Sequence, residues 1–351
     1  MSYLETKSGN QQAEIYRMVV KRIVGKIEEQ GVEMSGYESS GVSGKITRET
    51  LPHKFPYPSA YSRMALGRDA EFGSIVVIKT YGQKTSEEGH SMEMNKAEAS
   101  FIAGWTNRYI RQHEEMGINV AKGVVLTAPM RGTDDWGIRL VQDFIKGPNF
   151  MDVFIEAVLK SNCQVEERLL EVLLGKIHQV HNYKSKDRDL FPYAPKDDWD
   201  LVTGIDGKPQ NIMLTDSQGT PQAVVVDVVY PTAKVDEEGT FVFIKARPGF
   251  VKKDPGWQYL KERLGDIRGL YAKTVLELGG GVAQGTDDLD LIKGVFGRLQ
   301  QGTVSFLEAN YNSGIAEPII SNIMGGCRDY LPMCGRGEQL RFERLLQAVD
   351  S

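Results

Sequence analysis

The order of two hydrophobic patterns along this 351-residue chain constrains its fold more than any other feature. Up to residue 145, most patterned segments are β-like: short runs of β-branched and apolar residues between turn-forming residues. From Met151 onward, apolar residues recur every three or four positions, which is typical of amphipathic helices. A β-rich first part followed by a helical second part predicts an α+β protein with two unlike lobes.

The same patterns predict the individual elements. Strands are expected at 62–68, 74–81, 124–129, 137–145, 211–215 and 223–229, and helices at 11–30, 91–113, 151–160, 166–182 and 261–278. Residues 31–50 are rich in glycine and serine and are expected to form a loop or an irregular hairpin. The glycine run 279–285 follows a predicted helix and lacks the lysine of a Walker motif, so helix termination explains it better than phosphate binding.

The composition limits the cellular compartments and the kinds of binding partner to be expected for this chain. The formal charge of −5 gives no broad attraction to nucleic acid or acidic lipid. Three scattered cysteines are too few for a disulfide framework. The N-terminus has no apolar core like that of a signal peptide, and no apolar stretch approaches the roughly 20 residues that span a bilayer. We therefore expect a cytoplasmic protein, or one exported without a classical signal, that binds neither nucleic acid nor membrane.

One polar stretch, Asp206-Gly-Lys-Pro-Gln-Asn211, has the composition of a phosphoryl-transfer site, and Asp227 follows it after a short predicted hairpin. Transfer from ATP requires charge neutralisation and an oriented nucleophile rather than covalent help from the protein. Asp206 could orient an attacking hydroxyl, and Lys208 could stabilise the transferring phosphoryl group. The side chains of Asn211 and Asp227 are suited to hold Mg²⁺. The alternative is a surface turn followed by a buried strand.

The motif Asp-x-Lys-Pro-x-Asn with the apolar tail Ile212-Met-Leu214 resembles the catalytic loop of Ser/Thr protein kinases. The resemblance implies the two-lobed protein-kinase-like α+β fold, ATP and Mg²⁺ as cofactors, and a protein hydroxyl as acceptor. Val76-Val-Ile-Lys79 likewise resembles the strand whose lysine pairs with the ATP phosphates. Glu98 stands where the family keeps that lysine's ion-pair partner, and Glu93 is the alternative.

Further segments extend the resemblance over residues 51–280. Leu140 to Gly147 resembles the hinge between the lobes, which implies adenine contacts at Gln142, Asp143 and Ile145. The phosphate-covering loop falls at 56–62, with Ser59 and Ala60 as its candidate contacts. The implied division is an N-terminal extension at 1–50, an N-lobe and hinge at 51–147, and a helical C-lobe at 148–351. An insertion at 183–201 is a candidate partner-binding loop, although a loop without a partner is the simpler reading.

Several positions depart from the kinase pattern. Gly204-Ile205 replaces His-Arg before Asp206, and Val228-Val229 replaces Phe-Gly after Asp227. The loop at 56–62 has prolines and no glycine, so it offers fewer backbone donors to phosphate. The segment 36–44 is an alternative cover for the nucleotide. Three hypotheses follow: an atypical Ser/Thr protein kinase, a pseudokinase scaffold that binds nucleotide and a protein partner, and a small-molecule kinase similar to aminoglycoside or choline kinases.

Overall fold

The chain divides into two compact units in the computed structural model. The sheet unit comprises residues 1–15, 36–146 and 224–245, and the helical unit comprises 16–35, 147–223 and 246–351. The N-terminal extension expected at 1–50 is thus divided between the two units. The structure describes residues 9–47, 63–81, 95–130, 134–182, 209–216, 219–226, 233–235, 241–243, 267–314, 316–317, 319–321, 323 and 336–350.

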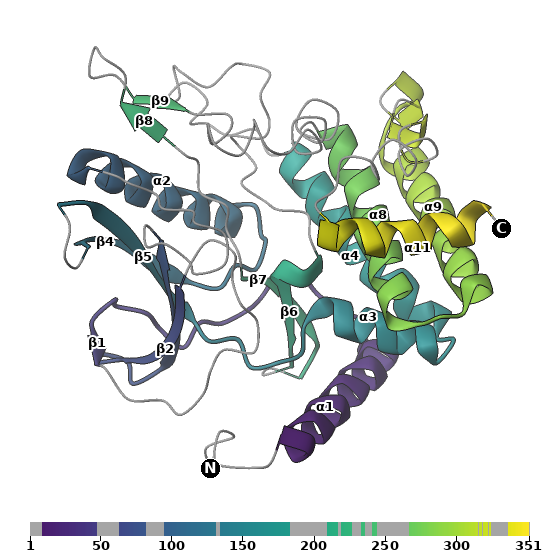
Figure 1. Ribbon diagram of the computed structural model, residues 1–351, viewed down its shortest axis with the longest axis horizontal. Coiled ribbons are helices and arrows are strands. Elements are labelled where there is room, and N and C mark those ends of the chain that lie inside the picture. Colours follow the sequence, from purple (N-terminus) through teal and green to yellow (C-terminus); the bar gives the residue numbers. More distant parts are fainter. Residues whose placement is uncertain are drawn as a thin grey trace. The chain divides into compact units, whose positions relative to one another are not determined.

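The sheet unit is built on a five-stranded antiparallel sheet with the strand order β1-β2-β3-β5-β4. Its strands are β1 (Ile46–Thr47), β2 (Arg63–Asp69), β3 (Ile75–Tyr81), β4 (Gly123–Pro129) and β5 (Trp136–Asp143). Figure 1 labels β1, β2, β4 and β5 of this sheet. In the central pair, Val76 lies opposite Asp143 and Lys79 lies opposite Leu140. Alternation of side chains along β3 buries Val77 and Lys79 on the same face.

Helix α2 (Lys96–Glu115) follows β3 and packs against β4 and β5 (Figure 1). Asn107 joins the helix to the sheet, because its side chain accepts from Val125 N at 2.9 Å and donates to Val125 O at 3.2 Å. The helix also contacts β8 (Ala233–Val235), which pairs with β9 (Phe241–Phe243) in a separate two-stranded sheet. The segment that carries Glu98 is therefore fixed on the sheet.

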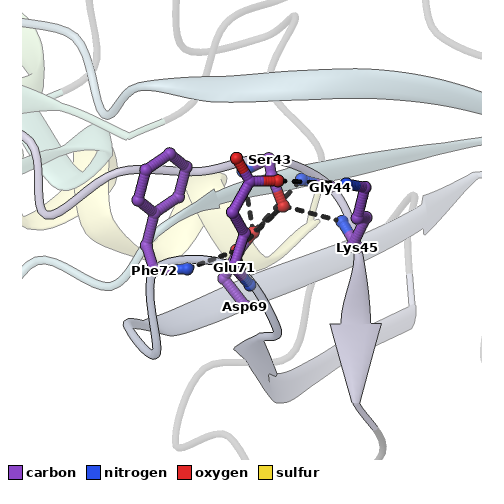
Figure 2. Close-up of polar contacts among 6 residues, drawn as sticks. All are labelled: Ser43, Gly44, Lys45, Asp69, Glu71 and Phe72. Atoms are coloured by element: carbon purple, nitrogen blue, oxygen red, sulfur yellow. Dashed lines mark hydrogen bonds and ion pairs between the residues drawn. The ribbon is translucent and has the colours of Figure 1, made fainter.

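Asp69 ties the Gly/Ser-rich segment 36–44 to the turn between β2 and β3 (Figure 2). Its carboxylate accepts from Ser43 N at 2.7 Å, from Ser43 Oγ at 2.9 Å and from Gly44 N at 3.1 Å. The amides of Glu71 and Phe72 in the turn donate to the same carboxylate at 3.0 and 3.1 Å. Burial acts to raise the pKa of Asp69, but these hydrogen bonds favour the ionised form and lower it to about 2.

The helical unit is a set of packed helices with a small polar turn and hairpin among them. It contains most of α1 (Gly9–Gln30), then α3 (Phe150–Leu159), α4 (Cys163–Asn182), the 3₁₀ turn η2 (Pro209–Asn211), β6 (Ile212–Thr215), α8 (Ile267–Gly285), α9 (Leu289–Asn310) and α11 (Arg336–Asp350). Strand β7 (Gln222–Val225) pairs with β6, and the boundary between the units falls within it. Helix α8 contacts α3, α4, α9 and α11 and therefore forms the centre of this packing.

The prediction that the glycine run 279–285 ends a helix is wrong, because α8 continues to Gly285. These glycines allow neighbouring elements to approach closely. A Cβ atom on Gly281 would lie 2.4 Å from Met151 Sδ, and one on Gly279 would lie 2.8 Å from the Phe296 ring. Tight packing around the helix offsets the weak helix propensity of glycine here.

The predicted α+β fold class is confirmed: the chain has a β-rich unit and a helical unit, and apart from α1 the main sheet precedes the helices of the helical unit along the chain, as expected for the two-lobed, protein-kinase-like fold. Predicted strands and helices in the described ranges appear in sequence order, with ends shifted by a few residues. The structure also has elements that were not predicted individually. They include β1, which lies within the expected loop and pairs with the end of β2, and the elements β8, β9, α9 and α11. Among the described helices, none has the length and apolar character needed to span a membrane.

We predict that Asp69→Asn destabilises the protein in a pH-dependent way. Because the folded-state pKa of about 2 lies below the unfolded value of about 3.9, the carboxylate stabilises the fold fully above about pH 5 and loses this effect as the pH falls towards 2. At neutral pH the variant should lose about 1–3 kcal/mol of unfolding free energy, the usual cost of leaving buried donors unpaired.

Urea unfolding from about pH 7 to about pH 2.5 measures this difference, which should shrink as the pH falls. Glu71→Gln is the matched control, since the Glu71 carboxylate makes an exposed ion pair with Lys45 at 3.1 Å. A pH-independent deficit in the Asp69 variant would contradict the role assigned to its charge.

Candidate nucleotide and catalytic site

Lys79 lies in β3 with its ammonium group in the interior of the sheet unit. Its side chain is 8% exposed, and Nζ donates a hydrogen bond to Val226 O at 2.8 Å. Val226 follows β7 and directly precedes Asp227, the candidate metal ligand. The sheet unit therefore brings the candidate phosphate-binding lysine to the residue beside Asp227, although the two are far apart in sequence.

Residues 119–121, between α2 and β4, also hold the C-terminal end of β7. Val225 forms a parallel bridge with Val120: Val225 N donates to Asn119 O at 2.9 Å and Ala121 N donates to Val225 O at 2.8 Å. Val225 is buried, at 1% exposed. The chain leading to Asp227 is thus held by main-chain bonds from one side and by Lys79 from the other.

The predicted hinge residues cluster around the end of β5. Gln142 and Asp143 are both buried within the strand, and Ile145 is buried just beyond it. Asp143 N donates to Lys122 O at 2.8 Å, and Gln142 Nε2 lies 3.4 Å from Ala121 O. Consequently β5 and the end of β7 are both hydrogen-bonded to the same short segment, residues 119–122.

Tyr37 and Ser39, in the segment 36–44 that was an alternative cover for the nucleotide, join this cluster, although neither was predicted as a site residue. The hydroxyl of Tyr37 donates to Asp143 Oδ2 at 3.0 Å, and Ser39 Oγ donates to the same oxygen. Tyr37 N donates to Asn119 Oδ1 at 2.8 Å. Burial, together with the negative charge of Asp143, raises the pKa of the Tyr37 phenol, so the phenol stays protonated and remains a donor.

In the helical unit, Asn149 holds the end of the predicted catalytic loop. Its Oδ1 caps α3 by accepting from Met151 N at 2.9 Å, and its Nδ2 donates to Gln210 O at 2.6 Å. The side chain of Gln210 reaches Glu277 of α8 at 3.4 Å, and Leu214 N donates to Pro148 O at 2.9 Å. Asn211, the next residue and candidate metal ligand, is half-buried at the end of η2.

Several predicted site residues lie outside what the structure describes. They are Asp206, Lys208, Asp227, Ser59, Ala60 and the side chain of Glu98, together with the insertion 183–201. Their roles stay predictions.

The oxygen donors proposed for a metal, the amide of Asn211 and the carboxylate of Asp227, are of the type that Mg²⁺ prefers. Within the described ranges, no group of three His, Cys, Asp or Glu side chains forms another metal site. Among the described histidines, His178 packs edge-on against Tyr311 with ring centroids 5.1 Å apart. The side chains of Asn211 and Asp227 are thus each of the chemical type that Mg²⁺ binds, and their role as metal ligands stays a prediction.

No protein-family model matches the chain, and no curated protein matches it in sequence. Among solved structures, the chain is similar to WaaP in complex with acyl carrier protein at 14% identity, with a TM-score of 0.32, covering 79% of this chain and 89% of that one. It is also similar to the PAN3 pseudokinase of Drosophila melanogaster at 13% identity, with a TM-score of 0.34 and coverage of 87% and 67%.

A third similar structure is the MAP kinase LmaMPK10 of Leishmania major, at 12% identity, with a TM-score of 0.30 and coverage of 95% and 86%. All three likenesses are distant, with identities of 12–14% and TM-scores of 0.30–0.34. The functional interpretation depends on this chain's own residues.

We predict that Gly147→Ala disrupts the attachment of β6 next to the catalytic loop. A Cβ atom at Gly147 would lie 1.7 Å from Leu214 O, so the backbone must move, at a cost of about 2–3 kcal/mol. Gly175→Ala in α4 is the control: a Cβ atom there meets nothing within 4 Å, and the change should stabilise the helix by up to about 1 kcal/mol. Chemical denaturation of both variants measures the two effects. Equal stability of the two would show that the close approach at Gly147 is wrong.

Proposed function

We propose that this chain is an atypical Ser/Thr protein kinase that transfers the γ-phosphate of ATP to a protein hydroxyl with Mg²⁺. The hydrogen bond of 2.8 Å from Lys79 Nζ to Val226 O, next to Asp227, carries the proposal. A lysine that binds nucleotide phosphates must lie close to the carboxylate that holds the phosphate-bound metal, because both act on the same oxygens.

Lys79 has the properties that this role requires. Its ammonium is largely removed from water, and a charge in such surroundings interacts more strongly with phosphate than an exposed charge does. Its side chain extends from β3, whose backbone pairs with β2 on one side and β5 on the other. Glu98, on the helix that packs on this sheet, is the proposed ion-pair partner that orients the ammonium.

The remaining roles follow from the positions of the residues along the chain. Asp206 orients the acceptor hydroxyl and Lys208 stabilises the transferring group, and Asn211 follows them in the sequence at the end of η2. Mg²⁺ held by Asn211 and Asp227 would neutralise the charge on the phosphates. Main-chain groups at Asp143 and Ile145, beside the Gln142 side chain, contact the adenine, and Ser59 and Ala60 contact the phosphates. The insertion 183–201 is the proposed contact for a protein partner.

The second candidate function is a pseudokinase scaffold that binds nucleotide without transferring phosphate. It is favoured by the prolines at positions 56 and 58 and by Val228-Val229 after Asp227. Proline lacks a backbone N–H, so this loop offers fewer donors to stabilise a transferring phosphoryl group. A small-molecule kinase is the third candidate. It differs from the first in transferring phosphate to a metabolite instead of a protein hydroxyl.

The first test is nucleotide binding. Mg–ATP should raise the melting temperature, since a ligand that binds only the folded state stabilises it by about 2.7 kcal/mol at 100 times its Kd. Asp227→Ala should remove the Mg²⁺-dependent part of the shift, and Lys79→Met should weaken binding overall. Lys45→Met is the matched control, because the Lys45 ammonium makes only an exposed ion pair with Glu71. The absence of any shift or calorimetric heat in the wild type at millimolar Mg–ATP would sink the proposal.

The second test is phosphate transfer. With labelled ATP, Mg²⁺ or Mn²⁺ and a generic protein substrate, the wild type should form phosphoserine or phosphothreonine, on the substrate or on itself. Asp206→Ala should reduce transfer by at least about 100-fold while ATP binding stays near wild type, because the residue acts on the acceptor hydroxyl and not on the nucleotide. Binding without any transfer would favour the scaffold, and transfer only to a metabolite would favour the small-molecule kinase. Equal transfer by the wild type and the variant would mean that Asp206 is not the base.

A further inference from the structure

Helix α1 precedes every element of the kinase resemblance, yet it is an integral part of the helical unit. Its stripe of Val20, Ile23, Val24 and Ile27 is at most 5% exposed. Near its C-terminus, Arg168 of α4 donates to the carbonyl groups of Ile27 and Glu28, the latter at 2.7 Å. The helix is therefore fixed by both apolar packing and hydrogen bonds that satisfy its terminal carbonyls.

One polar side chain on this helix leads directly to the catalytic loop. The hydroxyl of Tyr16 donates to the carboxylate of Asp152 and accepts from Asn149 N at 3.1 Å. The side chain of Asn149 in turn donates to Gln210 O at 2.6 Å. A continuous chain of hydrogen bonds thus runs from α1 to the residue before Asn211.

We propose that α1 is a positioning element of the catalytic loop, acting through Tyr16 and Asn149. This role rests on the proposed function of residues 206–211. Neither residue is proposed to touch the nucleotide. Tyr16 fixes the backbone of Asn149, and Asn149 fixes the carbonyl of Gln210, which sets the direction from which Asn211 presents its amide to the metal.

The local structure of the loop explains why it needs this support. The turn η2 has only three residues, and such a short 3₁₀ turn has little stability of its own. Another side-chain link of this turn is the longer contact from Gln210 Nε2 to Glu277 at 3.4 Å. Because residues that orient metal ligands affect metal affinity as well as activity, loss of the tether should appear first in the Mg²⁺ dependence.

Two variants break the tether at different points. Tyr16→Phe removes only the hydroxyl. Asn149→Ser keeps a residue that caps helix α3 well but removes the amide that reaches Gln210 O. The control is Lys26→Met. It removes a different contact of α1, the ion pair between Lys26 and Asp216 at 2.9 Å. Asp216 directly follows β6, in the turn towards β7.

Mg²⁺ titrations of ATP binding and of phosphate transfer test the role. In both tether variants the half-saturating Mg²⁺ concentration should rise about tenfold, and excess Mg²⁺ should restore most of the lost activity. Lys26→Met should keep the wild-type Mg²⁺ dependence even if its melting temperature falls. An unchanged Mg²⁺ dependence in the tether variants would overturn the proposal and leave α1 with a purely stabilising role.

Hydrogen exchange separates this inference from the proposed function. Backbone amides of residues 210–214 should exchange faster in Tyr16→Phe and Asn149→Ser than in the wild type and in Lys26→Met, with no nucleotide present. If the wild type binds no Mg–ATP, the proposed function fails, whereas the exchange pattern still reports on the tether. Equal exchange in all four proteins would show that α1 does not hold the loop.

Discussion

A buried ammonium group bonded to the chain just before a carboxylate is the interaction on which the functional interpretation depends. Lys79 donates to Val226 O at 2.8 Å, and Asp227 is the next residue. Burying an ammonium is costly unless it is paired, so the sheet must hold both β3 and the end of β7 in place to keep the contact. Strand pairing fixes Lys79 from one side, and main-chain bonds to Asn119 and Ala121 fix the β7 end from the other. Most of the sheet unit can be understood as the support for this one contact.

The N-terminal extension supports the candidate site within each unit. In the sheet unit, Tyr37 bonds both to Asp143 at the hinge and to Asn119 beside β7. In the helical unit, Tyr16 bonds to Asn149, which bonds to the catalytic loop. Residues of the extension are thus hydrogen-bonded to the candidate site residues or to their immediate neighbours in both units.

Periodicity predicted the succession of strands and helices, because each strand of the sheet and each packed helix buries one face. The resemblance to protein kinases singled out Lys79 and the residues at the end of β5, and the structure bonds Lys79 to Val226, while the roles of these residues stay predictions. Other features depend on contacts that no local pattern reports. The role of Tyr37 depends on Asp143, more than a hundred residues away. The glycines of α8 were misjudged because helix propensity alone predicts a stop, while Met151, from a distant part of the chain, occupies the space that a side chain would fill.

The central claim is that the Lys79 ammonium lies beside nucleotide phosphates, and chemical labelling tests it most directly. An acyl phosphate of ATP transfers its acyl group to a nearby amine, forming an amide and releasing the nucleotide. With Mg²⁺ present, mass spectrometry should find Lys79 acylated ahead of the exposed lysines, although Lys79 is only 8% exposed, and excess ATP should suppress that modification alone. Modification of exposed lysines such as Lys45 with Lys79 left intact, or labelling of Lys79 that ATP does not suppress, would contradict a nucleotide site at this position.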